Sequence, residues 1–348
     1  MSRHPRELVF GIIAIGLVIG YGVLGSRAAP LVLPAGTPTP TPTKPVSAVP
    51  APQVAGTIAF TLRGDVYVLR DGRYVGVTSD ARSNQPNLSE DGRTLLFVRG
   101  EAINGKRDVD GQVTPAILRY TDIVKKDAGG GAESIVITGL LLQTASGFHS
   151  VAWWSGPALS PDARRFAVTT DAAGGASDLE VFDLQTGKRA ALLSQDSFLA
   201  DPAWSPDGKT IAVTSYTLGQ PRILLVPSDG RASSPLAIKG TTGESYRPSY
   251  SPDGVWITYT LRHEGRNDVH AVEVKTGQDV ALTSDGRSWN SVFSPDGRQI
   301  AFLRESVGVI DLYVMDVSDA LVGGPPRTAT KLTRGEGIDG DSRPAWGR

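Results

Sequence analysis

The residues with the most chemistry to offer in this sequence stand at one repeated position, the last one before a recurring apolar strand. They are Gln85, Asp201, Arg247, Asn290 and Arg343, and Gly156 is the one gap in the series. An arginine presents planar, charge-assisted donors that suit carboxylates, and exposed aromatic faces suit sugars and apolar side chains. This set predicts a surface that binds an acidic glycan or a peptide carboxylate, although Asp201 would oppose an anion locally.

Motifs with stricter geometry do not support a catalytic, metal or cofactor site. Gly335 to Gly340, GEGIDG, spells a dinucleotide fingerprint, but only eight residues follow it, which leaves no room for the required helix and strand. The chain has no cysteine and no Gly-x-Ser-x-Gly motif. The acidic groups around Asp108 and Asp339 lack the ligand count of a calcium loop, and His263 and His270 have no partners at metal spacing. We therefore expect no catalytic residue, no metal and no cofactor.

The strand that follows these polar residues belongs to a repeat. Its clearest copy is DPAWSPDGKTIAV from Asp201; full copies begin at Gln85, Gly156, Arg247 and Asn290, and a truncated one, RPAWGR, begins at Arg343. Each full copy reads as an apolar strand, a Ser-Pro-Asp-Gly turn and an alternating strand, and a third and a fourth strand follow it. Four strands per unit at a spacing of about 45 residues are typical of propeller blades.

The turn inside each copy has a conformational reason for its residues. Proline presets φ at the first turn position, aspartate tolerates the next, and glycine accepts the positive φ that closes a tight antiparallel turn. Ala163 replaces that glycine in one copy, which costs about 1 kcal/mol if the left-handed geometry is kept. Trp204 and Trp346 hold the repeat position otherwise held by Leu88, Leu159, Tyr250 and Phe293, which predicts that both are core residues.

The two ends of the repeat region complement each other. Residues 57–80 match strands two to four of a blade without a first strand, and RPAWGR supplies a first strand alone. The sequence therefore predicts an all-β, six-bladed propeller at 57–348, made of four-stranded antiparallel blades and closed by pairing the C-terminal strand with the N-terminal blade. The unit from Gln85 is longer than the others, and we expect two surplus loops in it, GEAINGKRDVDGQVT and KKDAGGGAES.

The region before the repeats divides into three parts. Residues 1–7 form a basic cytoplasmic tail, 8–25 a transmembrane signal anchor, and 26–56 a Pro/Thr-rich linker. The apolar run from Leu8 to Leu24 would be about 25 Å long as a helix, which favours an uncleaved anchor. Cleavage near Ala28 is the alternative, because small residues lie three apart there. In either case we expect the propeller outside the cytoplasm.

The charge of the chain argues against a nucleic-acid partner. Its formal net charge is −1, and basic residues are interspersed with acidic ones rather than clustered. We expect no nucleic-acid binding.

The repeats PAWSPDGKTIAV, PSYSPDGVWITY and VFSPDGRQIAF resemble the WD-related repeats of TolB-like β-propellers. The resemblance covers Thr57 to Arg348 and implies the propeller fold. It does not extend to the N-terminal α/β domain of TolB itself, because the Pro/Thr-rich segment occupies that place. Prolyl-oligopeptidase-type enzymes share such propellers but follow them with a hydrolase domain.

Placed on a propeller, the polar residues meet around one mouth of the central channel. The predicted ligand-binding residues are Gln85, Trp154, Asp201, Arg247, His263, Trp289, Asn290 and Arg343. We expect a membrane-anchored binding scaffold whose partner is an envelope protein, a peptide or a glycan. Two alternatives stay open: a polysaccharide lyase or hydrolase using Arg247, His263 and Arg343, and a passive envelope assembly component.

Overall fold

The computed structural model describes residues 54–171, 177–194, 198–217, 219–230, 234–236, 238–239 and 243–348. The predicted tail and anchor, and the linker up to residue 53, lie outside these residues. In the described part of the chain, no helix has both the length and the apolar character needed to cross a bilayer.

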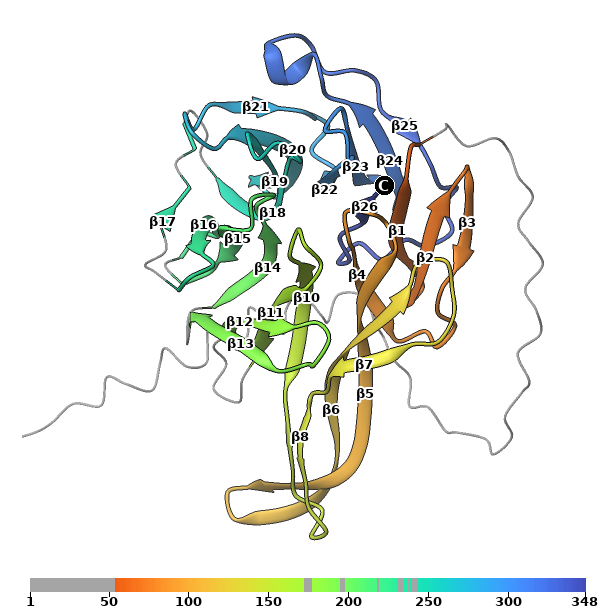
Figure 1. Cartoon of the computed structure of the whole chain (residues 1–348), viewed down its shortest axis with the longest axis vertical. Helices are drawn as coiled ribbons and strands as arrows, with labels where there is room; N and C mark the ends of the chain where they lie inside the picture. The colour runs from red at the N-terminus through yellow and green to blue at the C-terminus, as the bar shows by residue number, and fades with distance from the viewer. Residues whose placement is uncertain are drawn as a thin grey trace, which may run out of the picture. The chain divides into compact units, whose positions relative to one another are not determined.

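The described residues form antiparallel sheets, as expected for an all-β fold. Six sheets have four strands each, and every strand pairs with its neighbour in the chain except at one sheet. That exception, the first sheet, has the order β26-β1-β2-β3 and so combines both ends of the described chain (Figure 1). Its strands are β26 (Ala345–Gly347), β1 (Thr57–Leu62), β2 (Asp65–Arg70) and β3 (Arg73–Gly76).

The other five sheets follow in chain order. The second sheet contains β4 (Ser83–Leu88), β5 (Thr94–Val109), β6 (Gln112–Asp127) and β7 (Ser134–Ile137). The third contains β10 (Trp153–Leu159), β11 (Arg165–Asp171), β12 (Ser177–Asp183) and β13 (Arg189–Ser194). The fourth contains β14 (Leu199–Trp204), β15 (Thr210–Ser215), β16 (Arg222–Pro227) and β17 (Ser234–Pro235).

The fifth sheet contains β18 (Glu244–Tyr250), β19 (Trp256–His263), β20 (Arg266–Glu273) and β21 (Asp279–Ala281). The sixth contains β22 (Ser288–Phe293), β23 (Gln299–Ser306), β24 (Val309–Asp316) and β25 (Thr330–Lys331). A short 3₁₀ helix, η1 (Ala320–Val322), lies between the last two of these strands. A two-stranded sheet of β8 (Leu140–Gln143) and β9 (His149–Val151) is separate from the six.

Apolar side chains fill the spaces between neighbouring sheets rather than one central core. One buried cluster lies between each pair of consecutive sheets; between the second and third, for example, it joins Leu96 and Ile123 to Phe166 and Val168. The sixth sheet packs on the first in the same way, through Leu303 and Leu312 against Ile58, Phe60 and Trp346. Because each sheet is apolar on both faces, it needs a neighbour on both sides.

The core positions predicted from the repeat are buried. Trp204 is 8% exposed and Trp346 is 7% exposed, and their indole Nε1 atoms donate to the carbonyls of Ala158 at 3.0 Å and Ala55 at 2.8 Å. Trp346 pairs with Ile58 in the ladder between β26 and β1. The prediction that both tryptophans are core residues is confirmed.

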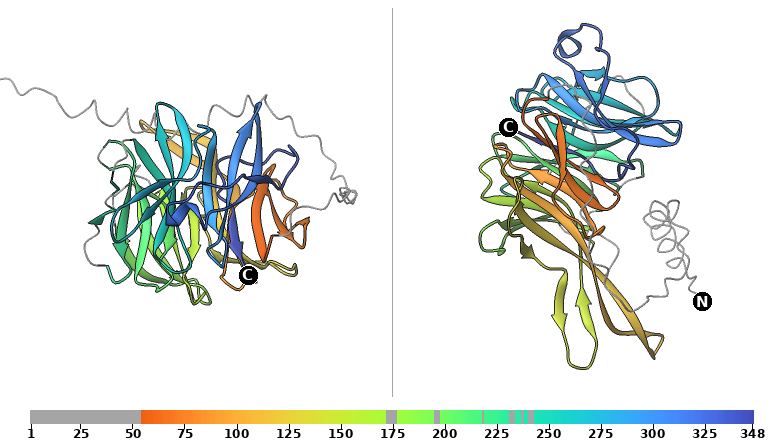
Figure 2. Two further views of the ribbon diagram at one scale, coloured as in Figure 1. Left: turned by 90° about the horizontal axis from the view of Figure 1, so that it is seen from above. Right: turned by 90° about the vertical axis from the view of Figure 1, so that its right-hand side faces the viewer.

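The first surplus segment of the second sheet is not a loop. β5 and β6 continue past the other strands as one hairpin, paired from Thr94 with Asp127 to Val109 with Gln112 (Figure 2). Asp110 and Gly111 turn it with φ of 52° and 79°, the two positive values of a tight hairpin turn. The Asp-Gly pair between two alternating segments was the signal for a hairpin in the sequence, and the expected loop was wrong.

Candidate functional site

The predicted polar positions share one backbone conformation. Gln85, Asp201, Arg247 and Asn290 have φ between 49° and 58°, and Gly156 has φ 59°. Each lies where the pairing between the first and second strand of its sheet shifts register, which marks a β-bulge. Bulges of this kind usually place glycine in the left-handed conformation and redirect a side chain. Holding four larger residues there costs on the order of 1 kcal/mol or more each, and strain of this type gathers at functional sites.

Hydroxyl groups of the preceding sheet hold these bulges in place. The amide of Arg247 donates to Thr214 Oγ1 at 2.9 Å, and the amide of Asn290 donates to Thr260 Oγ1 at 3.2 Å. The amide of Gln85 donates to Ser342 Oγ at 2.9 Å. These three bulges are therefore fastened to the neighbouring sheet, which orders the backbone that carries their polar side chains.

Three of the predicted residues converge on one carbonyl. Trp289 Nε1 donates to the Gly340 oxygen at 2.8 Å, Asn290 Nδ2 at 2.9 Å and Arg247 Nη1 at 3.5 Å. Arg247 Nη1 also donates to Asn290 Oδ1 at 2.6 Å. The segment around Gly340 thus occupies the donors that we expected a ligand to use.

Two carboxylates flank Arg247. Asp201 Oδ1 lies 4.0 Å from its Nε, and Asp341 Oδ1 lies 3.8 Å from its Nη2. The side chain of Asp341 is 84% exposed, whereas those of Arg247 and Asp201 are 22% and 27% exposed. We call Asp201, Arg247, Trp289, Asn290 and Asp341 the mouth cluster. Its most exposed charged side chain is that of Asp341, so its accessible surface is more acidic than the sequence indicated.

Arg343 and Gln85 join sheets to one another. The guanidinium of Arg343 donates to the carbonyl of Pro248 and, at 3.2 Å, to that of Pro202, so it links the first sheet to the fourth and fifth. The pKa of Arg343 is lowered, mainly because its side chain is buried. The charge of Asp201 opposes this shift, and the charge of Arg247 adds to it. Gln85 Oε1 accepts the amide hydrogen of Gly156 at 2.6 Å. Both side chains are engaged in holding the sheets together.

Two predicted site residues lie elsewhere. Trp154 is 6% exposed and packs edge-to-face on Phe182, with ring centroids 5.4 Å apart, inside the cluster between the second and third sheets. Side chains alternate along a strand, so Trp153 is exposed and Trp154 is buried. His263 lies at the exposed tip of the β19–β20 hairpin and lines a surface hollow with Gln220 and Glu244. The prediction that Trp154 binds a ligand at the channel mouth was wrong, because its side chain is buried. The role of His263 stays a prediction.

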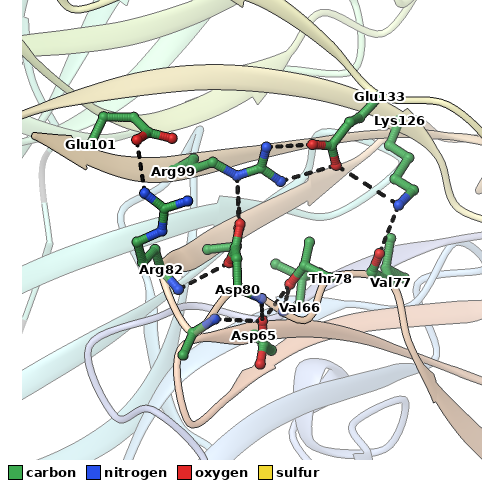
Figure 3. A network of polar contacts seen from close by, with 12 residues as sticks. Asp65, Val66, Val77, Thr78, Asp80, Arg82, Arg99, Glu101, Lys126 and Glu133 are labelled. Atoms are coloured by element: carbon green, nitrogen blue, oxygen red, sulfur yellow. Dashed lines mark hydrogen bonds and ion pairs between the residues drawn. The ribbon is translucent and has the colours of Figure 1, made fainter. Parts of the chain in front are cut away.

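Sequence reasoning missed a second polar repeat, which Figure 3 shows between the first and second sheets. Asp65 Oδ1 accepts from Thr78 Oγ1 at 3.0 Å and from the amide of Asp80 at 2.8 Å, and Arg99 Nε lies 2.7 Å from Asp80 Oδ2. The guanidinium of Arg99 also donates to both carboxylate oxygens of Glu133.

The same arrangement recurs between the fifth and sixth sheets. Asp268 Oδ1 accepts from Thr283 Oγ1 at 2.9 Å, and Arg304 Nε lies 2.7 Å from Asp285 Oδ2. The near-identical segments TSDARS from Thr78 and TSDGRS from Thr283 were the available signal. Because the network repeats with the blades, its role is to fix the connection from one sheet to the next.

Comparison with known proteins agrees with this geometry. A family model described as the TolB beta propeller domain matches residues 142–290. This part of the chain is thus similar to the TolB beta propeller domain, and the relatives below support the same TolB-like propeller family. The Tol-Pal system protein TolB of Anaeromyxobacter dehalogenans (strain 2CP-C) is 36% identical over 111 residues, which are 32% of this chain and 25% of that protein. A TolB homolog of Chlorobium luteolum is 30% identical over 132 residues, 38% of this chain and 29% of that protein.

A solved structure supports the same fold. The crystal structure of TolB from Acinetobacter baumannii superimposes with a TM-score of 0.63 at 20% sequence identity, over 85% of this chain and 67% of that one. Identity at this level establishes the fold of a TolB-like propeller and does not assign a ligand or partner.

Proposed function

We propose that this chain is an extracytoplasmic scaffold of the cell envelope that binds a partner protein through the mouth of a closed six-bladed propeller. The observation that carries the proposal is the mouth cluster, where strained bulges from several sheets hold charged side chains together on a TolB-like propeller. The relatives named for the Tol-Pal system favour the envelope as the setting.

The closed ring is supported by contacts at both ends of the described chain. β26 pairs with β1, and apolar clusters lie between the sixth and first sheets as well as between the first and second. A closed ring is a rigid platform without long open edges, so partner binding costs little ordering of the backbone.

The charges of the mouth cluster favour a partner that brings hydrogen-bond donors. Arg247 is already surrounded by Asn290, Gly340, Asp201 and Asp341, so a carboxylate would have to compete with two acidic side chains for it. The exposed acceptor is the Asp341 carboxylate, which suits a lysine, an arginine or a backbone amide. This shifts our expectation away from an acidic glycan and towards a protein or peptide segment.

The apolar run from Leu8 to Leu24 and the Pro/Thr-rich segment after it support an anchored, single-pass arrangement with the propeller outside the cytoplasm. A linker of this composition reaches about 3.1 Å per residue, which lets the mouth cluster contact partners well away from the bilayer.

One crosslinking experiment tests both parts of the proposal. The photoreactive residue p-benzoylphenylalanine is placed at Asp341 or, as a control on the opposite face, at Lys209, whose side chain is 82% exposed. Cells are irradiated, and their membranes are then washed with carbonate. We expect the chain to stay with the washed membranes and the Asp341 variant, but not the Lys209 variant, to form an adduct with a specific envelope protein.

Other outcomes overturn a defined part of the proposal. An adduct from Lys209 alone would show that the partner binds the face opposite the mouth cluster, which contradicts the proposed binding face. No adduct from Asp341, together with turnover of an envelope polysaccharide by the purified chain, supports the enzymatic alternative. No adduct and no turnover support a passive assembly component. Release of the chain by carbonate contradicts the anchor.

A further inference from the structure

A cleft of about 560 Å³ lies between the second and third sheets, at the ends of the strands opposite the mouth cluster. Arg93 and Arg164 line it from the repeat turns, Lys125 from the end of β6, and Gln185 from the turn after β12. The mouth residues stand at the start of each innermost strand, whereas the repeat turns follow its end. This cleft is therefore on the other face of the propeller.

The two acidic residues of the cleft are engaged by their own turns. Asp127 Oδ1 accepts the amide hydrogen of Gly129 at 2.7 Å. Asp183 Oδ1 accepts from the amide and the hydroxyl of Thr186, both at 2.7 Å, and the hydroxyl hydrogen bond lowers the pKa of Asp183. Both carboxylates thus accept hydrogen bonds within their own turns, and neither forms an ion pair with a basic residue that the structure describes.

The basic residues of the cleft are less engaged. Lys126 donates to the carbonyl of Val77 at 2.8 Å and lies 3.8 Å from Glu133. Arg93, Lys125 and Arg164 form no ion pair with any residue that the structure describes. The cleft thus collects three cations without a close ion pair, although the charges of Arg93 and Arg164 also add to the serine hydrogen bonds that lower the pKa of Asp91 and Asp162 in their own turns.

We propose that this cleft binds an acidic peptide segment of a partner protein, at a site separate from the mouth cluster. Its volume is in the range of sites that enclose a short ligand, about 300 to 1,000 Å³. Unpaired guanidinium groups make charge-assisted, bidentate hydrogen bonds to carboxylates. The side chains of Thr94, Ser134 and Gln185 add partners for backbone amides. The lining contains no aromatic ring for a sugar to pack on, which favours a peptide over an acidic glycan.

A binding assay on the full-length chain tests this site. Fluorescently labelled hexaglutamate is titrated at low ionic strength and followed by anisotropy, because screening weakens contacts between exposed charges at higher salt. We expect the double variant Arg93→Gln/Arg164→Gln to bind at least about tenfold more weakly than the unmodified chain, through the loss of two charge-assisted contacts. Glutamine keeps the backbone hydrogen bonds of both turns, so the unfolding midpoint should be unchanged.

Arg298→Gln is the matched control, because Arg298 holds the same exposed position in the repeat turn of the sixth sheet and does not line the cleft. We expect it to bind hexaglutamate as the unmodified chain does. Equal losses in the control and the double variant, or no loss in either, would overturn the proposal. So would tighter binding of tetragalacturonate than of hexaglutamate, since the ligand would then be an acidic glycan. Crosslinking at Asp341 is read separately and bears only on the mouth cluster.

Discussion

At the scale of single residues, the repeat turn keeps its backbone conformation even where its glycine is missing. Ala163 has φ 51°, and glycines 92, 208, 254 and 297 have φ between 68° and 72° at the equivalent position. The turn is also held by a hydrogen bond between its serine and its aspartate, such as Ser205 Oγ to Asp207 Oδ1 at 2.7 Å. The surrounding hydrogen bonds therefore impose the left-handed conformation on alanine.

We predict that Ala163→Gly raises the free energy of unfolding by up to about 1 kcal/mol, because it removes the strain of a Cβ at positive φ. Gly208→Ala is the matched control. Its added Cβ would meet only Pro161 Cδ, at 3.9 Å, so strain rather than collision should lower the stability by a similar amount. Urea unfolding of both variants measures the effect, and a stabilising Gly208→Ala would refute the reasoning.

At the scale of elements, the short strand β26 decides whether the first sheet is complete. Its Ala345, Trp346 and Gly347 pair with β1, and Trp346 belongs to the cluster between the sixth and first sheets. Gly347 lies so close to Ser89 and Gly92 that an added Cβ would be 2.6 Å from their backbone atoms. The C-terminal strand is therefore enclosed by the second sheet as well as by the first.

We predict that removing residues 342–348 unfolds or aggregates the chain, since it exposes the edge of β1 and opens two apolar clusters. Trp346→Ala alone should cost about 3 to 5 kcal/mol, as for other buried aromatic truncations. Chemical denaturation gives the second value, and light scattering detects aggregation of the first variant. A truncated chain that unfolds with unchanged midpoint and cooperativity would show that the two ends do not share a sheet in solution.

At the scale of the whole molecule, the repeated turns make the free energy of unfolding depend on pH. The serine hydroxyl in each turn lowers the pKa of Asp91, Asp162 and Asp207, and a backbone hydrogen bond adds to the effect. A carboxyl group with a lowered folded-state pKa contributes stability above its unfolded pKa, about 3.9, and loses it as pH falls through the folded value.

We predict that the urea midpoint is nearly constant from pH 6 to about 4.5 and falls steadily below about pH 4. Asp207→Asn should lower the midpoint at pH 6 and make its fall below pH 4 shallower, because one titrating group is gone. A midpoint that is the same at pH 3 as at pH 6, or that rises on acidification, would contradict the role assigned to the turns.

Local patterns in the sequence determined much of the architecture. The recurrence of one strand-turn-strand segment predicted the four-stranded sheets, because alternation of apolar residues and turn residues is read from neighbours in the chain. The incomplete repeat units at the two ends predicted that β26 pairs with β1, because residues 57–80 lack a first strand and RPAWGR supplies only that strand. The buried positions of Trp204 and Trp346 followed from their place in the repeat.

Only the tertiary structure determined which groups the predicted site residues contact and which of them are buried. The repeat placed Arg247 and Asn290 at equivalent positions, with Trp289 next to Asn290, but the donors of all three converge on the carbonyl of Gly340, about 50 or more residues away in sequence. Trp154 is buried because a bulge and a neighbouring sheet set which of two adjacent tryptophans faces inward. The cleft at Arg93 and Arg164 is formed by two sheets together. Contacts of this kind depend on distance in space, which a periodic pattern along the chain does not encode.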